Sequence, residues 1–406
     1  MTITVVGLPR TTALDPARVV LGVLACAVVG LAPVDGYLHL VHPQLAKLPA
    51  VLLLVGWAAV RLARRQAPRA HPVHAPLAVL GAVLLASSAV HLTGPYTVGY
   101  LQRWVPFLVV TVVLMDVAAR EVPLRYLLAS AATGAAAAGL GALYSVVVAG
   151  DTRASGPLDD PNDLAYVLVA ALPLALVLAA RRATRLRWRL LALAGAGVMV
   201  VGAAGTLSRG GALALVAVAV CLGARRVLSR RVLAGAVGLV AAAVAVIALA
   251  LPQELSLALD EKRHVAAENV DSRTLRWQAA ARMLATDPVL GVGPGGFRER
   301  YAASSHRAEL MEQTPVAHDM YLEVGAELGW PGLAAFLGVI AVALLAAEDA
   351  IRRGDADERL LAVGVQAGLV AVAVASVFLS EQYYLPLWSL VAMACAAQPL
   401  TRRRAR

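Results

Sequence analysis

The chain has 406 residues, of which 60% are hydrophobic and 15% are charged, and its mean hydropathy is +0.72. Soluble domains are about half apolar and about a quarter charged, so this composition excludes an ordinary soluble protein. The net charge of +10 could suggest a nucleic-acid partner. We reject nucleic acid because the basic residues lie in short segments between long apolar runs, where they set the orientation of membrane helices.

The long apolar runs predict an all-α, polytopic transmembrane bundle of about twelve spans, since a helix needs about 20 apolar residues to cross a bilayer. The runs are rich in Ala, Val, Leu and Gly, and small residues let membrane helices approach closely. We predict spans near 18–38, 47–62, 76–92, 99–118, 124–149, 162–180, 190–206, 211–224, 232–252, 322–347, 360–379 and 385–399.

The distribution of arginine predicts the orientation of these spans. Most of the 36 Lys and Arg residues fall on one side when both termini are placed in the cytoplasm. Lys47, Arg103, Arg153 and Arg209 are the exceptions in the short outer loops. The predicted division is a cytoplasmic tail 1–17, spans 1–9 over 18–252, an extracytoplasmic segment 253–320, spans 10–12 over 321–399 and a basic cytoplasmic tail 400–406.

Taken in chain order, the first candidate segment runs from Gly156 to Ala165, before the predicted span at 162–180. Asp160 or Asn162 can cap that helix, and a helix N-terminus can face an anion. A purely structural cap is the simpler interpretation of Asn162.

The second segment, Ser208-Arg209-Gly210-Gly211, joins two apolar runs at the predicted outer face. The glycines predict a tight reversal and close backbone approach. An arginine at membrane depth is costly and usually functional, so Arg209 is a candidate for binding an anion. The alternative is an interfacial arginine whose charge reaches the headgroups.

The third segment, 271–288, is predicted to be helical, with Ser272 as N-cap and Pro288 closing the run. Trp277, Ala281 and Leu284 would share its buried face. Arg273 leans toward that face and is a candidate anion ligand, whereas Arg276 either shares that region or lies on a solvated face. The following run from Gly291 to Phe297 matches no phosphate-binding fingerprint, and we predict a tight turn.

The fourth segment, from Thr314 to Glu323, opens the predicted span at 322–347. Thr314 can cap it, and Pro315 suits the first helical position. His318 would then lie in the first turn, where the helix dipole favours a neutral imidazole. A neutral imidazole in a desolvated pocket can act as a general base; the alternative is an interfacial histidine bonded to the backbone. No cluster has metal-ligand spacing, so we expect neither metal nor cofactor.

These ordered stretches resemble the O-antigen ligase and O-antigen polymerase superfamily of bacterial membrane glycosyltransferases. They are Pro161-Asn162, Ser208 to Gly211, Arg273 to Trp277 followed by Asp287-Pro288 and Gly291-Val292-Gly293, and His318 to Glu323 followed by Glu327-Leu328-Gly329-Trp330-Pro331-Gly332. The resemblance covers about 160–335. Asp319 stands where the family commonly has Asn.

The resemblance implies a type-C-like enzyme in the bacterial plasma membrane that transfers a glycan from undecaprenyl pyrophosphate to a glycan, lipid or protein acceptor without a metal. By motif, Arg209 and Arg273 would bind the pyrophosphate and His318 would activate the acceptor hydroxyl. Ser208, Asn162, Arg276 and Asp319 would support them. The sequence does not separate a ligase from a polymerase.

Two other classes remain as alternatives. A twelve-span secondary transporter would show internal repeats and ionisable residues at mid-membrane depth. The span interiors here hold almost no acids or bases, which argues against transport. An inactive scaffold of a polysaccharide-assembly complex is the second alternative.

Overall fold

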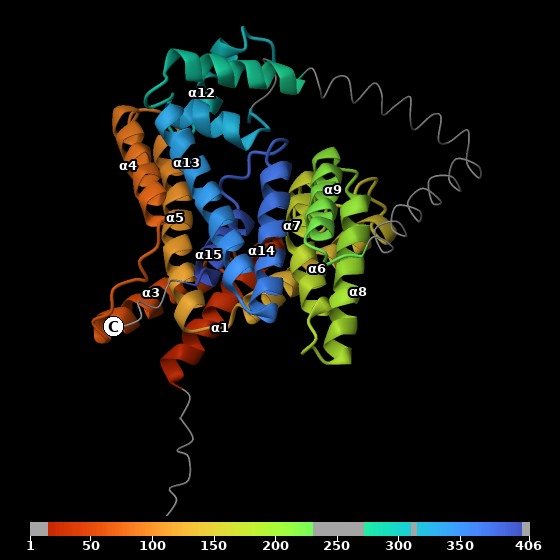
Figure 1. Cartoon of the computed structure of the whole chain (residues 1–406). Helices are drawn as coiled ribbons and strands as arrows, with labels where there is room; N and C mark the ends of the chain where they lie inside the picture. Colours follow the sequence, from red (N-terminus) through yellow and green to blue (C-terminus); the bar gives the residue numbers. More distant parts are fainter. Residues whose placement is uncertain (1–14, 230–271, 310–314, 400–406) are drawn as a thin grey trace, which may run out of the picture.

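The computed structural model describes residues 15–229, 272–309 and 315–399, and within these ranges the regular elements are all helices (Figure 1). The predicted all-α class is therefore confirmed. The helices are α1 Pro16–Leu31, α2 Asp35–Val41, α3 Leu48–Ala63, α4 His74–Val90, α5 Thr97–Arg120, α6 Leu124–Val147, α7 Pro161–Ala180, α8 Leu186–Gly205, α9 Arg209–Ala224, a helix over 272–286, α12 Gly296–Ser304, α13 Met320–Arg353, α14 Ala356–Ala375 and α15 Leu385–Ala397.

The helices coincide with the predicted spans to within a few residues. Among the described residues, 7 helical stretches are long and apolar enough to cross a membrane, and α3, α4, α9 and α15 are shorter apolar helices. The chain is thus a multi-pass membrane protein. The span predicted near 232–252 lies outside the described residues, and the total of twelve remains a prediction. The first span bends at a 3-10 turn, Ala32–Val34, that contains Pro33.

Helix α7 lies at the centre of the bundle. In its most apolar stretch 78% of residues are buried, against 22% for α8, and α7 packs on α6, α8, α9 and α14. A helix that is apolar on all sides is stable only when it is surrounded. Its central place explains why it is largely buried from Leu164 onward, whereas the polar residues of its first turn are half-buried.

Close contacts between helices rely on small residues. A methyl group added to Gly134 of α6 would lie 2.0 Å from the Gly30 oxygen of α1, and one added to Gly368 of α14 would lie 2.9 Å from the Ala170 oxygen of α7. Neither position can carry a larger side chain without moving backbone. This agrees with the view that packing, rather than hydrophobic contrast, holds membrane helices together.

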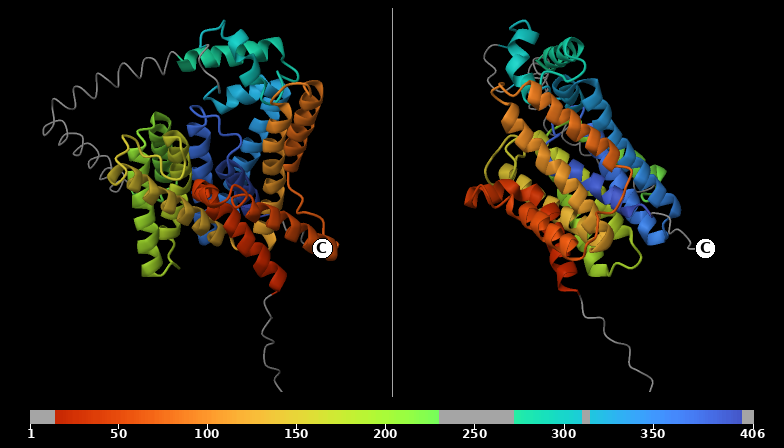
Figure 2. Two further views of the ribbon diagram at one scale, coloured as in Figure 1. Left: turned by 180° about the vertical axis from the view of Figure 1, so that it is seen from behind. Right: turned by 90° about the vertical axis from the view of Figure 1, so that its left-hand side faces the viewer.

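The bundle has two chemically different ends. At one end, called the site end, α7, α9 and α13 begin, and the helix 272–286 and α12 lie across the bundle there (Figure 1). At the other end, called the opposite end, α1, α6 and α8 begin; both views of Figure 2 place the start of α1 far from α12. That the site end faces outward remains the sequence-based prediction, as does the assignment of 253–320 to the outside.

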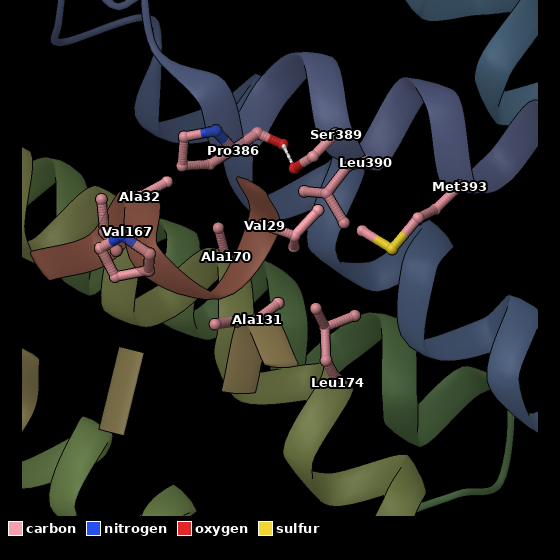
Figure 3. A pocket seen from close by; sticks show the side chains of 12 residues that line it. Val29, Ala32, Ala131, Val167, Ala170, Leu174, Pro386, Ser389, Leu390 and Met393 are labelled. Carbon is pink, nitrogen blue, oxygen red and sulfur yellow. Dashed lines mark hydrogen bonds between the residues drawn. The ribbon is translucent and has the colours of Figure 1, made fainter. Parts of the chain in front are cut away.

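A small apolar cavity lies between α1, α6, α7 and α15 (Figure 3). Its volume is about 30 Å³, and its lining includes Val29, Val167, Leu390 and Met393. The Ser389 hydroxyl in its wall donates to the Pro386 oxygen. A water molecule needs two to four polar partners, which this lining does not offer, so the cavity is a packing gap rather than a binding site.

Candidate functional site at the ends of α7, α9 and α13

The first turns of α7 and α9 lie against each other and against the loop 376–384. A methyl group added to Gly211 would lie 2.8 Å from Ala165 Cβ, and one added to Gly210 would lie 3.0 Å from Phe378 Cβ. The glycines therefore allow the close approach that the sequence predicted. The predicted reversal is displaced, however: the chain turns at 206–208, where Leu207 has a φ of 54°, and both glycines are already helical.

Arg209 is the first residue of α9. The hydroxyl of the N-cap Ser208 accepts a hydrogen bond from the Gly211 amide at 3.2 Å, so Ser208 fixes the start of the helix. The Arg209 side chain is exposed, and it stands where the unpaired amides of a helix N-terminus favour an anion.

Arg273 approaches Arg209 from the helix 272–286. It is half-buried, and its pKa is lowered first by burial and then by the positive charge of Arg209, while the Asp160 carboxylate opposes the shift. Within the described ranges neither guanidinium group makes a hydrogen bond or an ion pair. Two cations thus repel each other at the site end, and an anion between them would relieve that repulsion.

Asn162 makes structural hydrogen bonds to Asp160 and Arg153 near this pair of arginines. Asp160 is the N-cap of α7 and accepts from the Asn162 amide at 2.7 Å. Asn162 Oδ1 accepts from Arg153 at 3.4 Å, and Arg153 Nε donates to the Thr206 oxygen at 2.9 Å. These bonds tie the loop before α7 to the turn before α9. The capping interpretation is confirmed for Asp160.

His318 precedes α13 rather than lying in its first turn. The N-cap is Asp319, whose Oδ1 accepts from the amides of Tyr321 and Leu322, both at 2.9 Å. Pro315 is not helical, and Thr314 lies outside the described residues. The prediction for the start of this helix was therefore wrong, because a carboxylate four residues after Pro315 provides the stronger cap. His318 is half-buried with a φ of 51°.

Asp319 is engaged in capping and therefore has a structural role. Burial raises the pKa of its carboxyl group, and the two capping amides oppose that shift.

Glu323 fastens the segment that carries His318 to the loop 376–384. Its Oε2 accepts from the Ala317 amide at 2.8 Å and from the Ser380 hydroxyl at 2.6 Å, and its Oε1 accepts from Gln382 at 2.7 Å. The side chain is 3% exposed. From the sequence, Glu323 was only a member of the family pattern and had no predicted role.

The same loop connects the two parts of the site. The Met320 amide donates to the Ser376 oxygen at 2.9 Å, and Phe378, two residues further, packs on Gly210 next to Arg209. The structure thus brings the segments of His318, Arg209 and Arg273 to one end of the bundle.

Arg276 is buried and supports the helix of Arg273 instead of facing the site. Its Nε and Nη2 donate to Glu309 at 3.1 and 3.2 Å. Ser272, predicted as an N-cap, is itself helical, and its hydroxyl binds the same carboxylate. The predicted buried face is correct in part: Leu284 is buried and Trp277 is half-buried, but Ala281 is exposed. The other buried positions of this helix are Arg276, Ala279, Ala280 and Met283. The ion pair with Glu309 explains why Arg276 can be buried.

The glycine-rich run is a structural turn, as predicted. Gly291, Gly293 and Gly295 have positive φ angles of 63°, 92° and 75°. The Gly293 amide donates to the Glu327 oxygen at 3.0 Å, and the Gly295 amide donates to Glu327 Oε1 at 2.8 Å. The turn therefore joins α12 to α13.

A pair of carboxyl groups, of which one is buried and one half-buried, was not predicted. Asp163 of α7 and Glu381 interact, and the Tyr384 hydroxyl donates to Asp163 at 3.4 Å. Burial raises the pKa of Glu381 well above its usual range, and the neighbouring Asp163 charge raises it further. The sequence signal was the polar and aromatic run from Ser380 to Tyr384 between two apolar spans.

Comparison with known families agrees with this geometry. A family model described as O-antigen ligase matches residues 194–337. The match covers about a third of the chain and includes Arg209, Arg273 and His318. No curated protein matches the chain. The match agrees with the resemblance predicted from the motifs.

Proposed function

We propose that the chain transfers a glycan from undecaprenyl pyrophosphate to an acceptor hydroxyl at the outer face of the bacterial plasma membrane, with both termini in the cytoplasm. The observation that carries the proposal is that Arg209, at the N-terminus of α9, and the nearby Arg273 make no hydrogen bond or ion pair with any described residue. A pyrophosphate offers several oxygens to such a pair, and arginine binds them by charge-assisted, often bidentate hydrogen bonds. The O-antigen ligase family match supports this class of donor.

The proposed reaction is a single displacement. The acceptor oxygen bonds to the anomeric carbon while the bond from that carbon to the pyrophosphate oxygen breaks, which inverts the anomeric centre. His318 takes the hydroxyl proton, and the two arginines stabilise the charge that grows on the leaving pyrophosphate. The arginines supply the counter-charge, so the proposal assigns no step to a metal ion.

The test separates donor binding from transfer. Arg209→Ala and Arg273→Ala should each weaken binding of glycan-free undecaprenyl pyrophosphate to the purified protein by about tenfold or more, because a hydrogen bond to a charged group contributes about 1.5–3 kcal/mol. His318→Ala should leave that binding nearly unchanged and reduce glycan transfer by about 10²–10⁴. Binding can be measured by thermophoresis and transfer with a labelled lipid-linked oligosaccharide.

Arg282→Ala is the matched control. Arg282 lies on the same helix as Arg273, is exposed, and donates to the Ser304 oxygen at 2.7 Å, so both binding and transfer should persist. Undiminished affinity in the Arg209 and Arg273 variants would remove the pyrophosphate site. Full transfer by His318→Ala would remove the general base.

A polymerase of the same family is the first alternative. Incubation with a labelled lipid-linked repeat unit alone distinguishes the two, because only a polymerase lengthens glycans without a second acceptor.

A secondary transporter is the second alternative, and the positions of the ionisable residues along the helices argue against it. Asp163 and Glu323 are in the first turns of α7 and α13, and Arg61 and Asp116 are near the ends of α3 and α5, whereas transporters bind substrate near mid-membrane depth.

A further inference from the structure

A long groove runs along the surface of the bundle between α1 and α6, away from the site end. Its volume is about 1140 Å³, which exceeds the roughly 300–1,000 Å³ of most small-molecule pockets. Small residues at four-residue spacing line it, including Gly22 and Cys26 of α1 and Ala129, Thr133 and Ala137 of α6. These short side chains leave the space between the helices open.

Two arginines lie at the mouth of the groove, which is at the opposite end of the bundle. Arg18 is in the first turn of α1, Arg125 is in the first turn of α6, and both are exposed. The Arg125 guanidinium lies 4.8 Å from the centroid of the Tyr126 ring, which also lines the groove. The groove is therefore apolar along its length and basic at its mouth.

No acid among the described residues neutralises the positive charge at the mouth. Glu121, the acid in the lining, pairs with Arg61 at 2.9 Å on its buried side. Arg18 Nε donates to the Glu121 backbone oxygen at 3.1 Å, and Arg125 Nη2 donates to the Tyr126 hydroxyl at 3.3 Å. Across the described ranges neither arginine forms an ion pair. Their neutral partners orient them and leave both charges available.

We propose that this groove binds an anionic phospholipid of the leaflet at the opposite end, with the phosphate between Arg18 and Arg125 and an acyl chain along α1 and α6. Basic residues at a bilayer surface attract anionic headgroups, and the apolar walls match hydrocarbon. A zwitterionic lipid would fill the same walls but carries no net charge for the arginines. The site is separate from the pyrophosphate site and does not depend on the proposed reaction.

Native mass spectrometry of the full-length protein in detergent, titrated with phosphatidylglycerol or phosphatidylcholine, tests the proposal. The wild type should retain phosphatidylglycerol in preference to phosphatidylcholine. The Arg18→Gln, Arg125→Gln double variant should bind phosphatidylglycerol roughly 25-fold more weakly, since one basic residue near an anionic headgroup contributes roughly a fivefold factor. Thr133→Trp, an exposed position in the groove, should reduce binding of both lipids by filling the space.

The matched control is the Arg182→Gln, Arg185→Gln double variant. These exposed arginines lie in the turn between α7 and α8, at the same end of the bundle and away from the groove, so lipid retention should not change. Equal loss in this control, or unchanged phosphatidylglycerol affinity in the Arg18 and Arg125 variant, would overturn the site. If the spectra instead showed dimers without bound lipid, the groove would be assigned to a second copy of the protein, and the lipid site would also be overturned.

Discussion

At the scale of single residues, Glu323 joins two segments of the site end by hydrogen bonds. Its carboxylate accepts three hydrogen bonds, from Ala317, Ser380 and Gln382. Ala317 lies in the segment before α13, whereas Ser380 and Gln382 lie in the loop 376–384. Buried polar atoms need such partners. The position of His318 therefore depends on a carboxylate five residues away that has no contact with substrate in the proposed reaction.

Glu323→Gln should impair transfer while leaving donor binding intact. The amide nitrogen cannot accept, so one buried donor loses its partner at a cost of about 1–3 kcal/mol, and the His318 segment loosens. Glycan transfer should fall, and the melting temperature should decrease. Ser380→Ala removes a single donor and should have the smaller effect on both. A Glu323→Gln enzyme with normal transfer rates would show that His318 is positioned by other contacts.

The sequence identified Arg209 and Arg273 but not the residues that hold them. Arg209 lies in a turn signal between two apolar runs, and Arg273 follows a helix-start signal, so a local pattern reveals both as candidates. The Asp163–Glu381 pair and the Glu323 contacts join segments distant in sequence, and periodicity carries no information on such pairs. Arg276 was ambiguous for the same reason, since its burial depends on Glu309.

At the scale of elements, α13 has a bend at a single residue, Gly329. Gly329 has a φ of 67° and a ψ of −174°, which interrupts the helix. The Trp330 amide, released from the helix, donates to the Pro288 oxygen at 2.9 Å, and the Glu327 carboxylate before the bend binds the Gly295 amide. The bend therefore attaches the helix 272–286 and α12 to the bundle and fixes the position of Arg273.

Gly329→Ala should destabilise the protein strongly. A methyl group there would lie 2.6 Å from the Pro288 oxygen and 2.7 Å from the Val289 carbonyl carbon, and the positive φ alone costs an alanine about 1 kcal/mol or more. We expect a lower melting temperature and weaker binding of undecaprenyl pyrophosphate. Gly197→Ala in α8, where no atom lies within 4 Å, should change neither. An unaltered melting temperature for Gly329→Ala would mean that the bend is not required.

Hydropathy predicted the existence of the helices better than their details. Run length and end signals located every described helix of the bundle, because about 20 apolar residues have few other stable arrangements in a bilayer. The bend at Gly329 was not predicted, since Gly329 and Pro331 lie inside an otherwise continuous apolar span. The start of α13 was misplaced because Thr314, Pro315 and Asp319 all resemble helix starts and only tertiary contacts select among them.

At the scale of the whole molecule, the arginines at the two ends of the bundle differ in their ion pairing. At the opposite end ion pairs join different helices or their ends, among them Arg61–Asp116, Arg64–Asp15, Arg181–Asp357 and Arg225–Glu348. Others lie within one helix, such as Arg120–Asp116 in α5 and Arg353–Asp349 in α13. At the site end Arg209 and Arg273 have no such partner among the described residues. Most ion pairs of the described residues thus lie away from the two arginines proposed to bind substrate, although Arg276–Glu309 and Arg300–Asp287 stabilise the site end itself.

Asp116 is the centre of the opposite-end network and provides the last prediction. It is fully buried and accepts from Arg61 Nε at 2.7 Å, Trp57 Nε1 at 2.8 Å and the Arg69 amide at 2.8 Å. Arg69 in turn donates to the Ala396 oxygen at the end of α15. Asp116→Ala leaves Arg61, which is 4% exposed, with only the Glu121 carboxylate as a charged partner.

Removing one partner of a buried ion pair costs about 3–5 kcal/mol, so Asp116→Ala should markedly lower the melting temperature and the yield of folded protein. The folded fraction should still bind undecaprenyl pyrophosphate normally, because the network lies at the far end from Arg209 and Arg273. Arg352→Ala removes an exposed pair with Glu348 and should change stability by about 0–1 kcal/mol. If Asp116→Ala instead weakened donor binding per folded molecule, the two ends would be coupled, and the separation of stabilising charges from binding charges would be wrong.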